Sequence, residues 1–278
     1  MRLAISNIAW DISEDEGIAR LLQRFGVDAI DVAPGKYFHE PAKARNEDIA
    51  RVKSWWADYG IEITGMQALL FGTSGLNVFG PPEVQEAMLQ HLTAVCRIGA
   101  VLGATQLVFG SPKNRDRTGL SDGEVTDVAI SFFRRFGDIA QFYGVVICLE
   151  PNPPCYGANF MTTSAETAKV VRQIQHPAIM MQLDTGAITI NGEDPGIVLQ
   201  SCASLIGHVH ASEPNLLPLG DGGTNHVKVL EALQLYLPNH VVSIEMLATK
   251  AEPHDVAIER ALGVAIQCYR HNDVGCQV

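Results

Sequence analysis

The chain has 278 residues, of which 47% are hydrophobic and 18% charged, and its net charge is −11. This is the composition of an ordinary globular enzyme, and the acidic balance disfavours a nucleic-acid partner, because proteins that bind phosphate backbones cluster Lys and Arg. No apolar stretch approaches the roughly 18 residues of a membrane span, so we expect no membrane partner either.

Short apolar runs recur along the whole chain and predict eight strands. They occupy residues 3–6, 28–33, 61–67, 105–110, 145–150, 178–184, 205–211 and 241–246. The runs are apolar on both faces, which is typical of parallel strands that are covered on both sides.

Helical patterns separate these runs. They span residues 18–26, 47–60, 83–103, 123–144, 194–203, 226–237 and 254–270, and a further helix is expected to start after Thr163. Pro82 is expected to open the third of these helices and Gly103 to end it. Eight strand–helix units predict a single-domain (β/α)8 TIM barrel over residues 1–278. An open doubly wound sheet is the alternative, but residues 6–11 lack the glycines of a phosphate loop after the first strand.

The six cysteines form no CxxC pair, and the first residues read as a strand followed by acidic residues and not as a signal peptide. We therefore expect reduced thiols, including that of Cys276, and a cytoplasmic location.

Four polar residues close four successive apolar runs: Glu150, Asp184, His210 and Glu245. They are about one strand-plus-helix unit apart, so in a barrel they would converge at one end. An unpaired charge at such a position is costly, and separate ion pairs are the alternative explanation. Three carboxylates and one imidazole suit one divalent metal, Mn²⁺ or Mg²⁺ first, with Co²⁺ or Zn²⁺ also possible.

The motifs around these residues resemble those of the xylose-isomerase-like superfamily of sugar phosphate isomerases and epimerases. The matching segments are EPNPP (150–154), LDTGA (183–187), GHVHASE (207–213) and IEM (244–246). Resemblance to its ketose 3-epimerases implies that Glu150, Asp184, His210 and Glu245 bind one Mn²⁺-like ion. It also implies that Glu150 and Glu245 are catalytic and exchange a proton beside a carbonyl, through a metal-bound enediolate. The substrate would be a small carbohydrate, and the protein a homodimer or homotetramer.

The sequence departs from those epimerases at three positions. Tyr156 stands in place of a second Glu, Ala187 in place of a His and Leu216 in place of an Arg. The metal ligands are thus retained while groups that orient the substrate are not, which leaves the sugar undetermined. Tyr156 itself becomes a candidate substrate contact.

Other polar residues near the predicted strand ends are candidates for binding substrate. Lys113 and Arg115 could bind a phosphate or carboxylate, and Lys36 is a similar candidate. Trp10 and Phe71 could line the substrate pocket with apolar surface.

The remaining candidates lie after the seventh strand. His208 points to the same face of its strand as His210. Glu213 could brace His210, and His226 could point inward. For each of these residues, and for Lys36, Lys113, Arg115, Trp10 and Phe71, ordinary packing or a solvated charge is the alternative.

Four function classes follow. The leading prediction is a divalent-metal-dependent sugar or sugar-phosphate isomerase or epimerase. A dehydratase of the inosose dehydratase type could use the same site, and a non-catalytic metabolite-binding barrel is a third possibility. A repair nuclease of the endonuclease IV type would need more histidine ligands, and the net charge of −11 also disfavours it.

Overall fold

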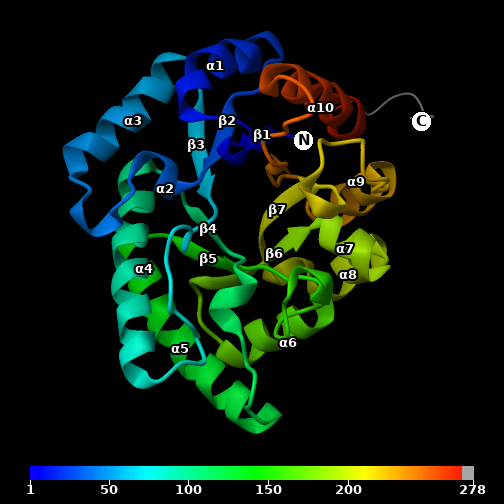
Figure 1. Cartoon of the computed structure of the whole chain (residues 1–278). Coiled ribbons are helices and arrows are strands. Elements are labelled where there is room, and N and C mark those ends of the chain that lie inside the picture. The colour runs from blue at the N-terminus through cyan, green and yellow to red at the C-terminus, as the bar shows by residue number, and fades with distance from the viewer. Residues whose placement is uncertain (271–278) are drawn as a thin grey trace.

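The computed structural model describes residues 1–270, so Cys276 lies outside the described residues. Eight parallel strands close into a barrel in the order β1 to β8, and β1 pairs with β8. The helices surround the strands (Figure 1), so the predicted (β/α)8 fold is confirmed. The bounds of the strands are β1 Leu3–Ser6, β2 Ala29–Val32, β3 Glu62–Met66, β4 Gln106–Phe109, β5 Val146–Leu149, β6 Ile179–Asp184, β7 Ile206–Ser212 and β8 Val242–Glu245.

The helices largely follow the sequence expectation. They are α1 Asp15–Arg24, α2 Pro34–Tyr37, α3 Asn46–Asp58, α4 Pro82–Leu102, α5 Asp122–Tyr143, α6 Ser164–Ile174, α7 Thr185–Asn191, α8 Pro195–Cys202, α9 His226–Tyr236 and α10 His254–Tyr269. Helix α4 begins at Pro82, and Gly103 ends it with a left-handed φ of 87°, as expected.

Helix α7 was not expected. The sequence TGAITIN is rich in β-branched residues, which have low intrinsic helix propensity. The helix forms because Asp184, the last residue of β6, accepts a hydrogen bond from the backbone N–H of Ala187 at 2.6 Å and so caps it.

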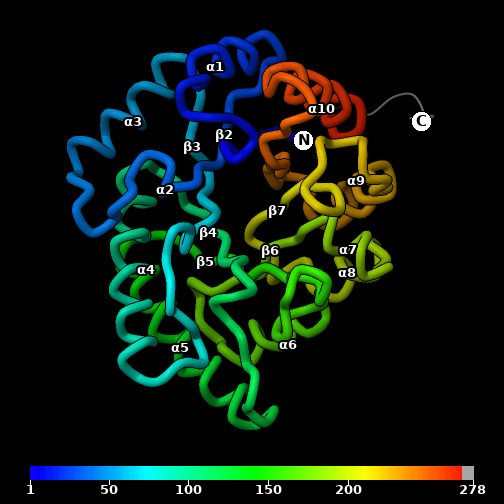
Figure 2. The backbone as a smooth tube through the Cα atoms, in the orientation of Figure 1, coloured from blue at the N-terminus to red at the C-terminus, as the bar shows by residue number. Residues whose placement is uncertain are grey.

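The two ends of the described chain meet on one side of the barrel. The smooth trace in Figure 2 shows α1 beside α10, and the amino group of Met1 donates to the carbonyl of Tyr269 at 2.8 Å. None of the helices in the described chain is long and apolar enough to cross a membrane.

The core lies both inside the barrel and between the strands and the helices. Every residue of β1, β2 and β8 is buried, as parallel strands covered on both faces should be. Because all strands run in parallel, the loops that follow them gather at one end of the barrel, where a TIM barrel carries its functional residues.

Candidate active site

The four strand-end residues meet at the carboxyl end of the barrel. Glu150 follows β5, Asp184 ends β6, His210 lies in β7 and Glu245 ends β8. One potential ligand atom from each lies within 4.8 Å of all the others. Exposed fractions are 9% or less for all four, so this is a buried cluster and not a set of separate surface ion pairs.

Two of the carboxylates are held by amide side chains. Asn152 donates to Oε2 of Glu150 at 3.0 Å, and Gln67 donates from β3's end to Oε1 of Glu245 at 2.7 Å. A Cβ at Gly110 would lie 1.8 Å from Oε2 of Glu150, so only glycine leaves room for that carboxylate. Such outer contacts fix the direction in which a carboxylate presents its oxygen atoms.

Asp184 is held from two sides. Its Oδ1 accepts from the backbone N–H of Ala187, and its Oδ2 accepts from the hydroxyl of Ser212 at 2.8 Å. Burial, with the negative charges of Glu245 and Glu150 added to it, raises the pKa of Asp184 well above its ordinary value. Carboxylates this close repel one another unless a positive charge lies between them.

His210 supplies the observation that tests whether a metal fits. Its ring is fully buried, yet neither nitrogen has a hydrogen-bond partner among residues 1–270. Nδ1 lies 3.2 Å from Oε2 of Glu245 and 3.7 Å from Oε1 of Glu150. Burial would lower the pKa of His210, but Glu245 and the other carboxylates outweigh it and raise that pKa well above 6.5. An orphaned nitrogen facing carboxylate oxygens fits a divalent cation with mixed O and N ligands.

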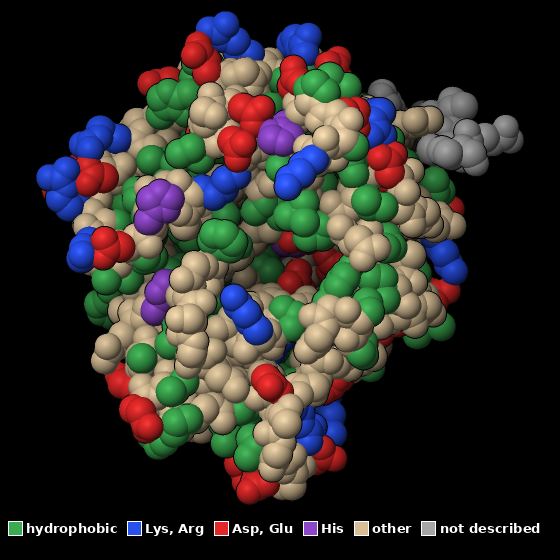
Figure 3. Space-filling model, in the orientation of Figure 1, with side chains coloured by type: hydrophobic (Ala, Val, Ile, Leu, Met, Phe, Trp, Pro, Cys, Tyr) green, Lys and Arg blue, Asp and Glu red, His purple; other side chains and the backbone are tan. Residues whose placement is uncertain are grey.

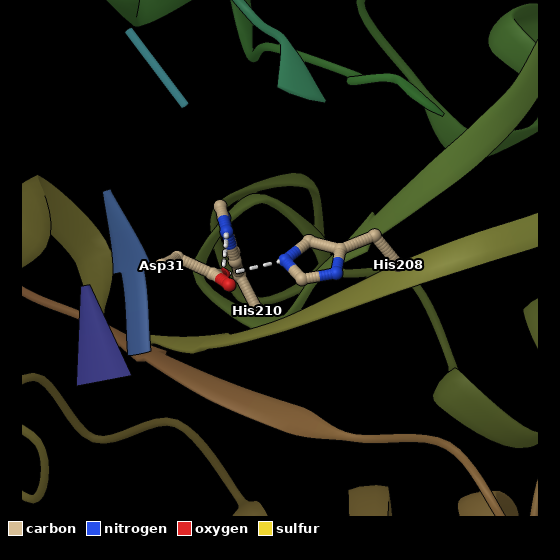
Figure 4. Close-up of side chains that lie close together, drawn as sticks. All are labelled: Asp31, His208 and His210. Atoms are coloured by element: carbon tan, nitrogen blue, oxygen red, sulfur yellow. Dashed lines mark hydrogen bonds and ion pairs between the residues drawn. The ribbon is translucent and has the colours of Figure 1, made fainter. Parts of the chain in front are cut away.

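Asp31 lies on the other side of His210. Figure 4 shows its carboxylate between two imidazole rings. Oδ2 of Asp31 is 2.8 Å from Nε2 of His208 and 3.8 Å from Nε2 of His210. Burial would raise the pKa of Asp31, but the two imidazoles outweigh it and hold that pKa well below its usual range. The fully buried Asp31 is thus a fixed negative charge beside the His210 ring, on the side away from Glu150 and Glu245.

A pocket of about 490 Å³ opens above the cluster, and Glu150 and Glu245 line it. Figure 3 shows the hollow near the middle of this face, with acidic side chains inside it. Lys36 and Lys113 also line the pocket. Nζ of Lys36 donates to the carbonyls of Asn7, at 2.7 Å, and Trp10. Lys113 is exposed.

Arg115 is placed differently from Lys113. Its side chain is fully buried, lies outside the pocket lining and donates from Nη1 to the carbonyl of Glu150 at 2.7 Å. Burial lowers the pKa of Arg115 to about 10. The structure therefore does not bring Lys113 and Arg115 together at the pocket.

Glu213 and His226 form a buried network after β7. Glu213 accepts from the backbone N–H of Gly220 at 2.7 Å and of Thr224 at 2.9 Å, and lies 3.1 Å from Nε2 of His226. Nδ1 of His226 in turn lies 2.7 Å from the hydroxyl of Tyr269. These contacts hold the loop between β7 and α9, and neither residue lines the pocket.

Trp10, His208 and Tyr156 also lie outside the pocket lining. Trp10 is fully buried and donates from Nε1 to Asp15 at 2.7 Å, and His208 faces Asp31. The hydroxyl of Tyr156 accepts from the backbone N–H of Asn215 at 2.7 Å and links two loops. Phe71, in contrast, does line the pocket and is 76% exposed.

Sequence reasoning missed four residues that contact the cluster: Asp31, Gln67, Asn152 and Ser212. Two signals were available. Asp31 is an acid inside an otherwise apolar run, and Gln67 closes the third run at the same end as the four ligand candidates.

Comparison with known proteins gives concordant results. The sequence model of the family described as xylose isomerase-like TIM barrel matches residues 19–267. The chain is 28% identical over 105 residues to D-psicose 3-epimerase from Ruminiclostridium cellulolyticum, a match that spans 38% of this chain and 36% of that enzyme.

Two solved structures share the fold at low sequence identity. D-psicose 3-epimerase with D-tagatose from Clostridium cellulolyticum H10 superposes with a TM-score of 0.79 at 20% identity, over 96% of this chain and 99% of that one. The 3-keto-D-glucoside 4-epimerase from E. coli superposes with a TM-score of 0.78 at 17% identity, over 96% of this chain and 100% of that one.

Proposed function

Because the chain belongs to the family of xylose isomerase-like TIM barrels, we propose that it is a divalent-metal-dependent isomerase or epimerase of a keto sugar or sugar phosphate. The observation that carries the proposal is the convergence of four buried ligand atoms within 4.8 Å, beneath a pocket that two of the same residues line. The names of the similar proteins, which include a ketose 3-epimerase and a keto-glucoside 4-epimerase, agree with this class of reaction.

Glu150, Asp184, His210 and Glu245 would hold the metal. Their three carboxylates and one imidazole form a mixed O and N ligand set, and we take Mn²⁺ as the proposed ion. When bound, the ion would act as a Lewis acid that polarises a substrate carbonyl and stabilises developing negative charge.

Glu150 and Glu245 would transfer the proton. Both line the pocket, and they come from β5 and β8, which are not neighbours in the barrel. One carboxylate would remove a proton from the carbon beside the carbonyl, and the other would return a proton to the enediolate. Gln67 and Asn152 would keep the two carboxylates oriented, because each donates to an oxygen of its Glu.

Asp31 would position His210. A histidine that ligates a metal usually presents its other nitrogen to a carboxylate or carbonyl, which fixes the ring and its tautomer. Oδ2 of Asp31 lies 3.8 Å from Nε2 of His210, which is ion-pair distance and not hydrogen-bond distance, and its hydrogen bond with His208 holds the carboxylate in place.

Two of the three predicted cationic residues remain candidates for contact with the substrate. Lys113 and Lys36 line the pocket and could meet a hydroxyl or an anionic group of the substrate. Arg115 would instead act on the substrate indirectly, through the main chain of Glu150.

The proposal is tested by metal content and by proton exchange. Purified protein should bind Mn²⁺ and gain thermal stability from it. In D₂O, the Mn²⁺-loaded protein should incorporate deuterium into a ketose from a panel, with no other change of product mass. A product lighter by one water would instead indicate a dehydratase. The absence of both metal binding and stabilisation would refute the proposal.

A further inference from the structure

The two sides of the pocket differ in chemistry. The side formed after β4 and β5 carries the polar groups Ser111, Lys113 and Glu150. Loops after β1, β3, β7 and β8 contribute six apolar side chains to the rest of the lining: Ile8, Leu69, Leu70, Phe71, Leu216 and Leu247. Two donors also lie in this part of the lining, and each has a protein partner: Lys36 donates to the carbonyls of Asn7 and Trp10, and Gln67 donates to Glu245.

The apolar side is held together by backbone hydrogen bonds. The N–H of Leu247 donates to the carbonyl of Leu216 at 2.9 Å, and the N–H of Ala248 donates to the carbonyl of Ile8 at 3.1 Å. The loops after β1, β7 and β8 therefore present Ile8, Leu216 and Leu247 as one surface beside Glu245. We call these three residues the apolar rim.

Leu216 is held in a conformation that leucine rarely adopts. Its φ is +53°, and that of Asn215 is +62°. Two contacts impose this turn: the N–H of Leu216 donates to the carbonyl of Glu213 at 2.9 Å, and the N–H of Asn215 donates to the hydroxyl of Tyr156 at 2.7 Å. Backbone strain of this kind gathers at ligand-binding sites, where the surrounding structure maintains it.

Apolar side chains in this position are costly unless something apolar covers them. Phe71 and Leu247 are 76% and 50% exposed, so the pocket mouth is an exposed apolar patch. A free sugar carries hydroxyls around its ring, and those facing leucine would lose water without gaining a hydrogen bond.

We propose that the apolar rim, with Phe71, is a subsite for an apolar substituent of the substrate. The substrate class is then a keto sugar that carries an alkyl or aryl group, with its hydroxyls toward Ser111 and Lys113. This inference rests on the proposed function, since it takes Glu150 and Glu245 as the reacting end of the pocket.

The test compares ligands that differ only in the substituent. Binding of phenyl and methyl β-D-glucopyranoside, two non-reacting probes, is measured by calorimetry on the Mn²⁺-loaded protein. The phenyl compound should bind at least about tenfold more tightly, because its ring removes more apolar surface from water. Glucose 6-phosphate tests whether the pocket prefers an anionic group, and it should bind more weakly than the phenyl compound.

The double variant Leu216→Asn with Leu247→Asn makes the rim polar. Asn tolerates a positive φ better than Leu, and Leu247 is half exposed, so both changes suit the fold. The phenyl preference should fall below about threefold. Leu235→Asn is the matched control, because Leu235 is 72% exposed on α9 and lies outside the pocket lining, and it should leave the preference unchanged.

Several outcomes would overturn the inference. These are equal affinity for the two glucosides, no measurable binding of either, tighter binding of glucose 6-phosphate, or a phenyl preference that survives in the double variant. A change of oligomeric state in the double variant would assign the rim to a contact between copies of the chain and would also overturn it. Mn²⁺ affinity and deuterium exchange in the same samples report separately on the proposed function.

Discussion

Replacement of Asp31 by Asn is expected to weaken Mn²⁺ binding by about 10- to 100-fold, the usual cost of losing an outer contact to a metal ligand. Asn has nearly the same shape as Asp, so the substitution removes the negative charge and leaves the side-chain volume nearly unchanged. Asp31 is fully buried and lies 3.8 Å from Nε2 of His210, so solvent does not screen that charge. Tenfold corresponds to about 1.4 kcal/mol of binding free energy.

The position of Asp31 can also be disturbed without changing its charge. A Cβ at Gly65 would lie 2.4 Å from Oδ1 of Asp31, whereas ordinary contacts begin at 3.4 Å. Gly65→Ala should therefore displace the carboxylate by about 1 Å and weaken Mn²⁺ binding in the same direction as Asp31→Asn.

Isothermal titration with Mn²⁺ measures the affinity, and the visible spectrum of the Co²⁺-loaded protein reports on ligand geometry. Asp15→Asn is the matched control. Asp15 is a buried carboxylate that accepts from Trp10 at 2.7 Å and Tyr37 at 2.8 Å, outside the metal cluster. Its variant should lose stability but keep its Mn²⁺ affinity and Co²⁺ spectrum. The reasoning fails if Asp31→Asn lowers stability and leaves affinity and spectrum as they were, or if Asp15→Asn changes both equally.

Four further outcomes are expected. Glu150→Gln and Glu245→Gln should each slow deuterium exchange by about 10²- to 10⁴-fold, the usual contribution of a general acid or base, and exchange that persists in both would exclude them as the proton-transfer pair. Mn²⁺ at 100 times its Kd should stabilise the fold by about 2.7 kcal/mol, seen as a higher Tm that EDTA reverses. Metal-free protein should lose stability as the pH rises above about 6.5 and through the raised pKa of His210, because in that window the folded protein binds more protons than the unfolded chain. Urea unfolding at pH 6 and pH 8.5 measures this change, and a higher stability at pH 8.5 would contradict it. Glu213→Gln should cost about 1–3 kcal/mol of folding stability and leave Mn²⁺ affinity intact, because Glu213 accepts hydrogen bonds from the backbone N–H groups of Gly220 and Thr224. A large loss of Mn²⁺ affinity would place Glu213 in the metal site instead.

The sequence by itself determined the barrel and the position of the ligand candidates along its strands. Apolar runs covered on both faces, separated by helical segments, leave few alternatives to parallel strands with connecting helices. Since all strands then run the same way, the residues that close them must share one end. That is why Glu150, Asp184, His210 and Glu245 could be grouped before their distances were known.

Only the tertiary structure decided what surrounds that group. Gln67 reaches Glu245 across 178 residues of sequence, and Asp31 reaches His208 across 177. No local pattern encodes such contacts, because closure of the barrel brings the strands together. Periodicity also did not distinguish Lys113, at the pocket, from Arg115, buried behind Glu150. The short 3-10 turn Pro112–Arg115 sets their directions, and a side chain two residues along a turn can face solvent or the core.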